Sequence, residues 1–401
     1  MRIGRFLLLG TLVGCGRSGP AQVRPGIEVL LSDSAHLVRG RQVGLLTNHT
    51  GIDRQGRRDV DLLVATPGVR LTALFSPEHG FQGTEDRPGL PDAVDSATGL
   101  PIYSLYSGAR PPNLAGLDGL DVLLIDLQDI GARYYTYVSS ALLLMREAAR
   151  RGKPVVVLDR PNPIGGELVQ GQVRPAPAPL EVFVGTLPVA MRHGMTLGEL
   201  VRLGNDVYGI GADLRVVPAS GWRRELYFDA TGLPWVRPSP NMPDLESALH
   251  YPGTCLFEGT NLSVGRGTPF AFQVIGAPWL DPDAVLRRLP DGAGVEVTAV
   301  EFTPRAPTDG KYDGVPLRGL RMRVTERSVY DPARLAVGLL AAIRAAHGDS
   351  LRFRPEGFDR LAAGPELREA ILAGWEASVI WDRWTAGLEQ FRGLRAKYLL
   401  Y

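Results

Sequence analysis

The sequence predicts an α/β protein, with a doubly wound parallel-sheet domain followed by a smaller α+β domain. Short apolar runs such as Asp121–Ile125 and Pro154–Leu158 alternate with amphipathic stretches, a pattern typical of parallel strands that helices bury on both faces. The length of 401 residues suits two domains. From about residue 228 the chain becomes a Pro- and Trp-rich loop. We therefore expect domains at residues 26–230 and 231–401.

The elements follow in chain order. In the first domain, strands are expected at Gln42–Leu46, Val69–Phe75, Asp121–Ile125 and Pro154–Leu158, and helices at Arg58–Ala65, Thr136–Arg151 and Thr196–Asn205. Thr196 and Glu199 form a capping-box pair at the start of the last helix. In the second domain, strands are expected at Val295–Phe302 and Gly319–Thr325, and helices at Pro332–Ala346, Glu366–Ala373 and Val379–Ala396.

The N-terminus has the features of an export signal. Arg2 and Arg5 precede an apolar run, Phe6–Gly14, whose nine residues span only ~14 Å as a helix, too short to cross a bilayer. The run ends at Cys15 in a sequence, Leu-Val-Gly-Cys, that resembles a bacterial lipobox. We expect residues 1–14 to be a signal peptide, Cys15 to be lipidated and residues 15–25 to be a tether. The protein would then be exported and lipid-anchored in the cell envelope, in the periplasm or outer membrane of a two-membrane cell; the alternative is that Cys15 is incidental.

Several function classes are disfavoured by composition and missing motifs. The formal net charge of +1 (44 Lys+Arg, 43 Asp+Glu) argues against a nucleic-acid binder. The two cysteines give no disulfide framework, and Cys255 is expected to be a buried structural residue. The sequence has no dinucleotide fingerprint, P-loop, zinc-ligand spacing or serine-hydrolase elbow. We expect no cofactor, no metal and no obligate protein partner.

Polar residues follow the ends of the four predicted strands of the first domain. They are Asn48 after the first, Glu78 and His79 after the second, Asp126–Asp129 after the third and Asp159–Asn162 after the fourth. In a doubly wound sheet the carboxyl ends of the strands border the ligand crevice. The sequence therefore predicts a binding site along this edge.

The residue types at this edge suit a saccharide. Burial of Glu78 at a strand end can raise its pKa and make it a general acid, although a solvated turn is the alternative. The segment Asp126–Tyr137 offers carboxylates, an amide, an arginine and tyrosines, which can hydrogen-bond or stack on a pyranose ring, although its tyrosines could equally be core residues. A glycine-rich segment contributes Glu258 and Arg266. A pair of carboxylates is the machinery of glycoside hydrolysis.

At these residues the chain resembles the exo-β-N-acetylmuramidase family of bacterial cell-wall hexosaminidases. The resemblance rests on LFSPEHGFQG at Leu74–Gly83, DLQDIGARYYTY at Asp126–Tyr137, LDRPNPIGG at Leu158–Gly166, MRHGMTLGEL at Met191–Leu200, and PSPNMP with YPGTCLFEGTNLSVGRGT within Pro238–Thr268. It implies a Rossmann-like domain without a nucleotide, a C-terminal domain, and a site in the cleft between them. It also implies release of N-acetylmuramic acid from the non-reducing ends of peptidoglycan-derived saccharides.

The resemblance assigns the catalytic glutamate to Glu78, with Glu258 as the first choice for its partner and Asp126 as the second. The substrate's own acetamido group could instead assist, with a carboxylate orienting it. A cation is needed for the lactyl carboxylate of muramic acid, and Arg133, Arg192 and Arg266 are the candidates. The full set of expected substrate-binding residues is Asn48, His79, Gln128, Asp129, Arg133, Tyr134, Tyr137, Asp159, Asn162, Arg192, His193, Asn261 and Arg266.

Two other functions fit parts of the pattern. A non-catalytic cell-wall glycan-binding lipoprotein would keep the fold without turnover. A hydrolase of ester or amide bonds would need a nucleophile beside a base, which the sequence does not display.

Overall fold

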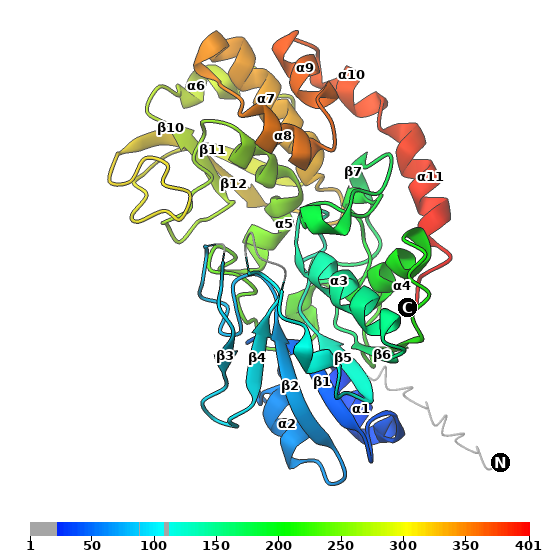
Figure 1. Ribbon diagram of the computed structural model, residues 1–401. Helices are drawn as coiled ribbons and strands as arrows, with labels where there is room; N and C mark the ends of the chain where they lie inside the picture. Colours follow the sequence, from blue (N-terminus) through cyan, green and yellow to red (C-terminus); the bar gives the residue numbers. More distant parts are fainter. Residues whose placement is uncertain (1–21, 88, 108–111) are drawn as a thin grey trace, which may run out of the picture.

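The computed structural model describes residues 22–87, 89–107 and 112–401. The predicted signal peptide, Cys15 and most of the tether lie outside the described residues. Two lobes are stacked along the long axis of the molecule, with the large sheet in the lower lobe of Figure 1. Within the described ranges, no helix is both long enough and apolar enough to cross a membrane.

A seven-stranded sheet forms the centre of the first lobe. In spatial order its strands are β3 (Ala93–Val94), β4 (Pro101–Ser104), β2 (Arg70–Ser76), β1 (Gln42–Thr47), β5 (Val122–Asp126), β6 (Val155–Leu158) and β9 (Leu214–Val217). All neighbours pair in parallel except β3, which is antiparallel to β4. The four strands predicted from apolar runs are all present.

Helices cover both faces of this sheet because successive side chains of each strand point to opposite sides. Leu124 of β5 packs in one apolar cluster with α1 (Gly26–Asp33) and α2 (Asp59–Ala65). Its neighbours Leu123 and Ile125 pack in the other cluster, with α3 (Tyr137–Arg150) and α4 (Leu197–Val207). The doubly wound, Rossmann-like architecture is therefore confirmed.

The helix α4 begins as the sequence predicts. The Thr196 hydroxyl accepts a hydrogen bond from the backbone N–H of Glu199, and the Glu199 carboxylate accepts one from the backbone N–H of Thr196. A further two-stranded ribbon, β7 (Gln170–Val173) with β8 (Ala190–Arg192), precedes this helix.

The second lobe is smaller and has the predicted α+β character. Its antiparallel sheet has the order β10 (Val274–Ala277), β12 (Leu317–Val324) and β11 (Val295–Phe302). Its helices are α5 (Leu245–Thr254), α6 (Pro282–Leu286), α7 (Pro332–His347) and α8 (Pro355–Ala362), and a 3-10 turn, η5 (Cys255–Gly259), follows α5. Cys255 is 1% exposed, so the prediction that it is buried is confirmed.

Three helices follow α8: α9 (Glu366–Leu372), α10 (Ala377–Asp382) and α11 (Thr385–Arg395), so the single helix predicted at Val379–Ala396 is two helices. α9 and α10 contact α7 in the second lobe, and α11 contacts β7 and returns the chain to the first lobe. Figure 1 shows α11 running down the side of the molecule, with the C-terminus beside α4. There the Tyr401 hydroxyl donates to Asp159 Oδ2 at 2.8 Å, and the Leu400 N–H donates to Glu199 Oε1 at 2.8 Å. These bonds tie the second lobe to the first.

Candidate active site

Glu78 follows β2 directly, at the carboxyl edge of the sheet. The order of the strands reverses between β1 and β5, and β2 is the next neighbour of β1, so Glu78 lies close to the switch point where ligands bind in such sheets. The chain turns sharply after Glu78, with φ of 69° at His79 and 75° at Gly80. The turn ends at Gly83. A glycine is required there, because a Cβ would lie 1.7 Å from the ring of His49.

A hydroxyl group holds the carboxyl group of Glu78. Thr136, at the start of α3, donates from Oγ1 to Glu78 Oε2 at 2.5 Å. Thr136 makes no side-chain capping bond to its own helix, so its hydroxyl is free for this contact. Two phenols lie near the same carboxyl group. Burial raises the pKa of Tyr106 and of Tyr137, and the charge of Glu78 raises both further.

Tyr137 is fixed between the two halves of the chain. Its hydroxyl accepts a hydrogen bond from Asn48 Nδ2 at 2.8 Å and donates to the Pro238 carbonyl. Its ring packs edge-on against Tyr135, with centroids 4.8 Å apart, and Tyr135 packs in turn against Tyr251 of α5. These tyrosines form a wall between the two lobes.

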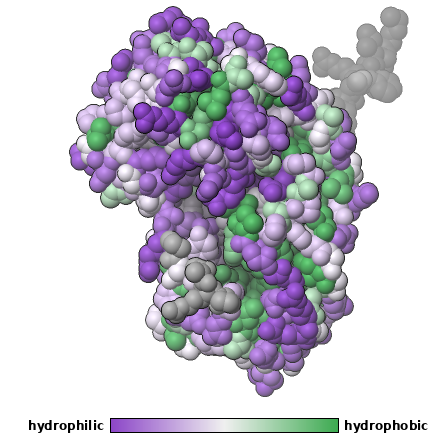
Figure 2. Space-filling view, turned by 45° about the horizontal axis from the view of Figure 1, so that its top comes forward, coloured by the Kyte–Doolittle hydropathy of each residue, from purple (hydrophilic) through white to green (hydrophobic). Residues whose placement is uncertain are grey.

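A cluster of charged residues spans the seam beside His79. Arg266 donates from Nη1 to Asp86 Oδ2 at 3.0 Å and pairs through Nη2 with Glu258 Oε1 at 2.6 Å. Asp86 Oδ1 lies 3.6 Å from His79 Nδ1, and its Oδ2 also accepts from Asn241 Nδ2 at 2.9 Å. Asp86 belongs to the first lobe and Arg266 and Glu258 to the second. Figure 2 shows that the surface is hollowed along the seam between the lobes.

Asp126 lies elsewhere, in a buried ion pair. It is 0% exposed, and both of its carboxylate oxygens accept from the guanidinium of Arg160, which is 5% exposed. The hydrogen bond between Arg160 Nη2 and Asp126 Oδ2 is 3.0 Å long. An atom with no exposure cannot reach a substrate, so this geometry is against the expected catalytic role of Asp126 and fits a structural one.

Two of the three candidate cations are also buried among backbone carbonyls. Arg133 donates to the carbonyls of Gln172 at 2.6 Å and Leu361 at 2.8 Å. Arg192 donates to the Ile164 carbonyl and to Gln170 Oε1, the latter at 3.0 Å. Burial lowers the pKa of both guanidinium groups. Both residues are buried, Arg133 at 3% and Arg192 at 1% exposed, and their Nη groups bind the protein itself, so neither is placed to bind the carboxylate of a substrate.

The side chains of four other predicted residues, and that of Asp159, form hydrogen bonds within the protein that stabilise its loops. Asp159 accepts from the Thr196 hydroxyl at 2.7 Å, and burial raises its pKa to about 6. Asn162, Asn261 and Gln128 bond to backbone groups, and the Tyr134 hydroxyl donates to the Pro252 carbonyl at 3.2 Å.

Asp129 and His193 form a buried pair near the tyrosine wall. The two groups approach to 3.9 Å between His193 Nε2 and Asp129 Oδ1. Burial raises the pKa of Asp129 to about 7 and lowers that of His193 to about 3. Asp129 Oδ2 has no hydrogen-bond partner. The charge of Asp129 is among the influences that raise the pKa of Tyr137, which links this pair electrostatically to the tyrosines beside Glu78.

Of the predicted site residues, Glu78, His79, Tyr137, Glu258 and Arg266 come together at the seam. Three further residues join them that the sequence did not single out: Thr136, Tyr106 and Asp86. Thr136 lies inside the segment Asp126–Tyr137, but its place in the sequence marks it only as the first residue of the helix expected at Thr136–Arg151. Asp86 lies in a polar loop three residues after Gly83, and no pattern marked it.

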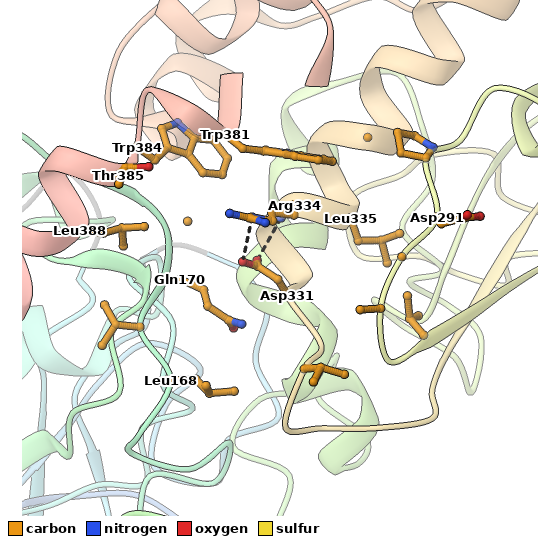
Figure 3. Close-up of a pocket in the computed structure, with 18 of the residues that line it drawn as sticks. Leu168, Gln170, Asp291, Asp331, Arg334, Leu335, Trp381, Trp384, Thr385 and Leu388 are labelled. Atoms are coloured by element: carbon orange, nitrogen blue, oxygen red, sulfur yellow. Dashed lines mark hydrogen bonds and ion pairs between the residues drawn. The ribbon is translucent and has the colours of Figure 1, made fainter. Parts of the chain in front are cut away.

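A separate cavity of about 460 Å³ lies at another part of the seam between the lobes. Figure 3 shows it lined by Gln170 and Leu168 on one side and by Arg334, Trp381 and Trp384 on the other. None of the five residues gathered around Glu78 lines it. Among the residues described, no group of three or more His, Cys, Asp or Glu side chains could hold a metal ion.

Comparison with known proteins gives relatives over nearly the whole chain. A curated relative, the peptidoglycan β-N-acetylmuramidase NamZ of Bacillus subtilis (strain 168), is 38% identical over 409 aligned residues, which cover 99% of this chain and 97% of the relative. Two crystal structures of DUF1343 family proteins from Bacteroides fragilis NCTC 9343 are also similar. One has a TM-score of 0.85 and 32% identity and covers 95% of this chain and 99% of its own. The other has a TM-score of 0.75 and 30% identity and covers 94% and 99%.

The family models match both parts of the chain. The model of the N-terminal domain of exo-β-N-acetylmuramidase NamZ matches residues 43–246, and the model of its C-terminal domain matches residues 249–401. The resemblance found in the sequence motifs is thereby confirmed: the chain belongs to the exo-β-N-acetylmuramidase NamZ family.

Proposed function

We propose that this protein removes N-acetylmuramic acid from the non-reducing ends of peptidoglycan glycan fragments, with Glu78 as the general acid. Its class, a glycoside hydrolase, follows from membership of the family. The observation that carries the proposal is the contact between Thr136 and Glu78 at the carboxyl edge of the sheet. This contact fixes one oxygen of a carboxyl group at the place where doubly wound proteins bind ligands.

The geometry suits proton transfer to a leaving sugar. Because Glu78 Oε2 accepts from Thr136, the proton of the neutral acid is placed on Oε1. Oε1 then gives this proton to the glycosidic oxygen as the bond from that oxygen to C1 breaks, and the leaving sugar departs with a free hydroxyl. A water molecule completes the reaction at C1. Glu78 accepts a proton from that water and is ready for the next cycle.

The second carboxylate in this proposal is Glu258. It lies on the opposite side of the seam and is linked to His79 through Arg266 and Asp86. The ion pair with Arg266 favours the carboxylate form of Glu258. As a carboxylate, Glu258 can either act on C1 directly or orient the acetamido group of the substrate. The complete burial of Asp126, at 0% exposure, supports Glu258 over Asp126 for this role.

The test offers two chromogenic substrates to the purified protein, a β-N-acetylmuramide and the corresponding β-N-acetylglucosaminide. We expect release of the chromophore from the muramide alone. Tight binding of the muramide without release by the unmodified protein would favour a non-catalytic glycan-binding protein. Faster release from the glucosaminide would contradict the proposed specificity.

We also propose that the protein is exported and anchored by a lipid at Cys15, on the basis of the sequence Leu-Val-Gly-Cys. A multiply acylated cysteine would hold the protein firmly at a membrane. Growth with a radioactive fatty acid should label the protein, and a Cys15→Ser variant should lose the label and the membrane association. Equal labelling of both forms would contradict the anchor.

A further inference from the structure

The proposed substrate carries a carboxylate that the site must recognise. Muramic acid differs from glucosamine by a lactyl group, and a guanidinium is the side chain best suited to bind its carboxylate. In the described structure, all three arginines that the sequence offers for this role already bind other groups of the protein. Arg133 and Arg192 are buried on carbonyl groups, and Arg266 already pairs with Asp86 and Glu258.

A different arginine, Arg360, stands on the helix α8 at the seam. This helix contacts residues of both lobes. The guanidinium of Arg133, from the first lobe, donates to the carbonyl of Leu361 at 2.8 Å. On the other side, α8 packs on the turn η5 that carries Glu258, so closely that a Cβ at Gly259 would lie 2.5 Å from the Cα of Phe358. The position of Arg360 is therefore fixed relative to Glu258 and to the first lobe.

Arg360 is exposed to solvent. Within the described residues, no carboxylate lies within 4.0 Å of its guanidinium and the side chain makes no hydrogen bond. The adjacent acid on the helix, Asp359, is occupied by Arg368 through two hydrogen bonds of 2.8 and 2.7 Å. An exposed arginine without a partner retains all of its donors for a ligand.

The charge of Arg360 acts on the same phenol as the charge of Glu78. Burial raises the pKa of Tyr106, the charges of Glu78 and Asp86 raise it further, and the charge of Arg360 opposes them. Tyr106 thus lies within electrostatic reach of both Glu78 and Arg360. A sugar bound with its glycosidic oxygen at Glu78 would therefore have a free guanidinium nearby.

We propose that Arg360 binds the lactyl carboxylate of the terminal muramic acid and so determines the preference for muramic acid over glucosamine. This inference rests on the proposed function. The guanidinium forms a charge-assisted, two-point contact with the carboxylate. Glucosamine residues have no group that can pair with it. Arg133 then acts as a positioning residue, because it holds the backbone of the helix that carries Arg360.

The experiment compares two muramide substrates that differ only in charge: the free lactyl acid and its methyl ester. Loss of a charged hydrogen-bonded contact should lower kcat/KM of Arg360→Ala for the acid by about 10- to 100-fold. The ester should be cleaved by this variant within about threefold of the unmodified enzyme, since it has no charge to lose. Arg334→Ala is the matched control, because Arg334 is an exposed arginine, 58% accessible, that lines the separate cavity. It should leave both rates unchanged.

A binding measurement separates this inference from the proposed function. The affinity of free N-acetylmuramic acid is measured by calorimetry for the unmodified protein and for Arg360→Ala. If neither protein cleaves a muramide but the variant binds N-acetylmuramic acid at least tenfold more weakly, the inference stands and the proposed activity fails. Equal losses on acid and ester, or unchanged affinity for N-acetylmuramic acid, would overturn the role of Arg360.

Discussion

Replacement of Thr136 by valine tests how Glu78 is held. Valine has nearly the shape of threonine, so the change removes a hydroxyl and leaves the packing of α3 intact. The hydroxyl makes no capping bond to the helix, and its one short contact is with Glu78 Oε2 at 2.5 Å. The loss should therefore fall on catalysis rather than on stability.

The expected magnitude follows from the burial of this contact. Thr136 is 8% exposed, so water cannot readily replace its hydroxyl at Glu78. A hydrogen bond to a charged group, which Glu78 becomes as it gives up its proton, contributes about 1.5–3 kcal/mol, or about 10- to 150-fold in rate. We expect Thr136→Val to lower kcat by an amount within this range, with little change in KM, because the contact orients the acid and does not touch the substrate.

The assay measures kcat and KM on a muramide, together with the melting temperature. Thr136→Ser is the control: it keeps the hydroxyl and should retain most of the activity. A valine variant within twofold of the unmodified enzyme would refute the reasoning. So would equal losses in the serine and valine variants, because the hydroxyl would then not be the cause.

Two further predictions concern buried charges. Arg160→Met leaves the carboxylate of Asp126 without a partner, next to Asp59, and should cost about 3–5 kcal/mol of stability, or roughly 6–20 °C in melting temperature by calorimetry. The double variant Arg160→Met with Asp126→Leu should recover most of this loss, and an equally unstable double variant would contradict the account. Asp129 keeps its proton to about pH 7 in the folded state but loses it near pH 3.8 when unfolded, so its contribution to stability is complete below pH 3.8 and falls as the pH rises towards 7. Relative to the unmodified protein, Asp129→Asn should therefore gain about 4 kcal/mol of stability between about pH 3 and pH 8. A stability difference that does not vary with pH would contradict this.

The fold was predictable where the local pattern is strong. β5 and β6 are continuous apolar runs because helices cover both of their faces, and such runs are visible in the sequence. The strand β11 has the predicted bounds Val295–Phe302. The strand β3 is not predicted because two residues carry no periodicity, and β7 is not predicted because its sequence, Gln-Gly-Gln-Val, is not an apolar run. The break between α10 and α11 was missed because an amphipathic pattern continues across it.

The site was predictable only in part, because sequence shows which groups exist and not how they pair. The acid at the end of β5, Asp126, was a reasonable candidate until the structure placed Arg160 of the next strand end against it. The same limit applies to Arg133, whose donors are satisfied by carbonyls 39 and 228 positions away. No sequence pattern marks Arg360 as a site residue, because it reaches the site only through the packing of α8 against both lobes.

Protonation of the leaving oxygen by Glu78 is tested by how the rate depends on the leaving group. Glu78→Gln is assayed on a disaccharide of N-acetylmuramic acid and N-acetylglucosamine, and on the 2,4-dinitrophenyl β-N-acetylmuramide, whose leaving group needs no proton. We expect a loss of about 10²- to 10⁴-fold on the disaccharide and a much smaller loss on the dinitrophenyl substrate. Equal losses on the two substrates, or near-normal cleavage of the disaccharide, would contradict it.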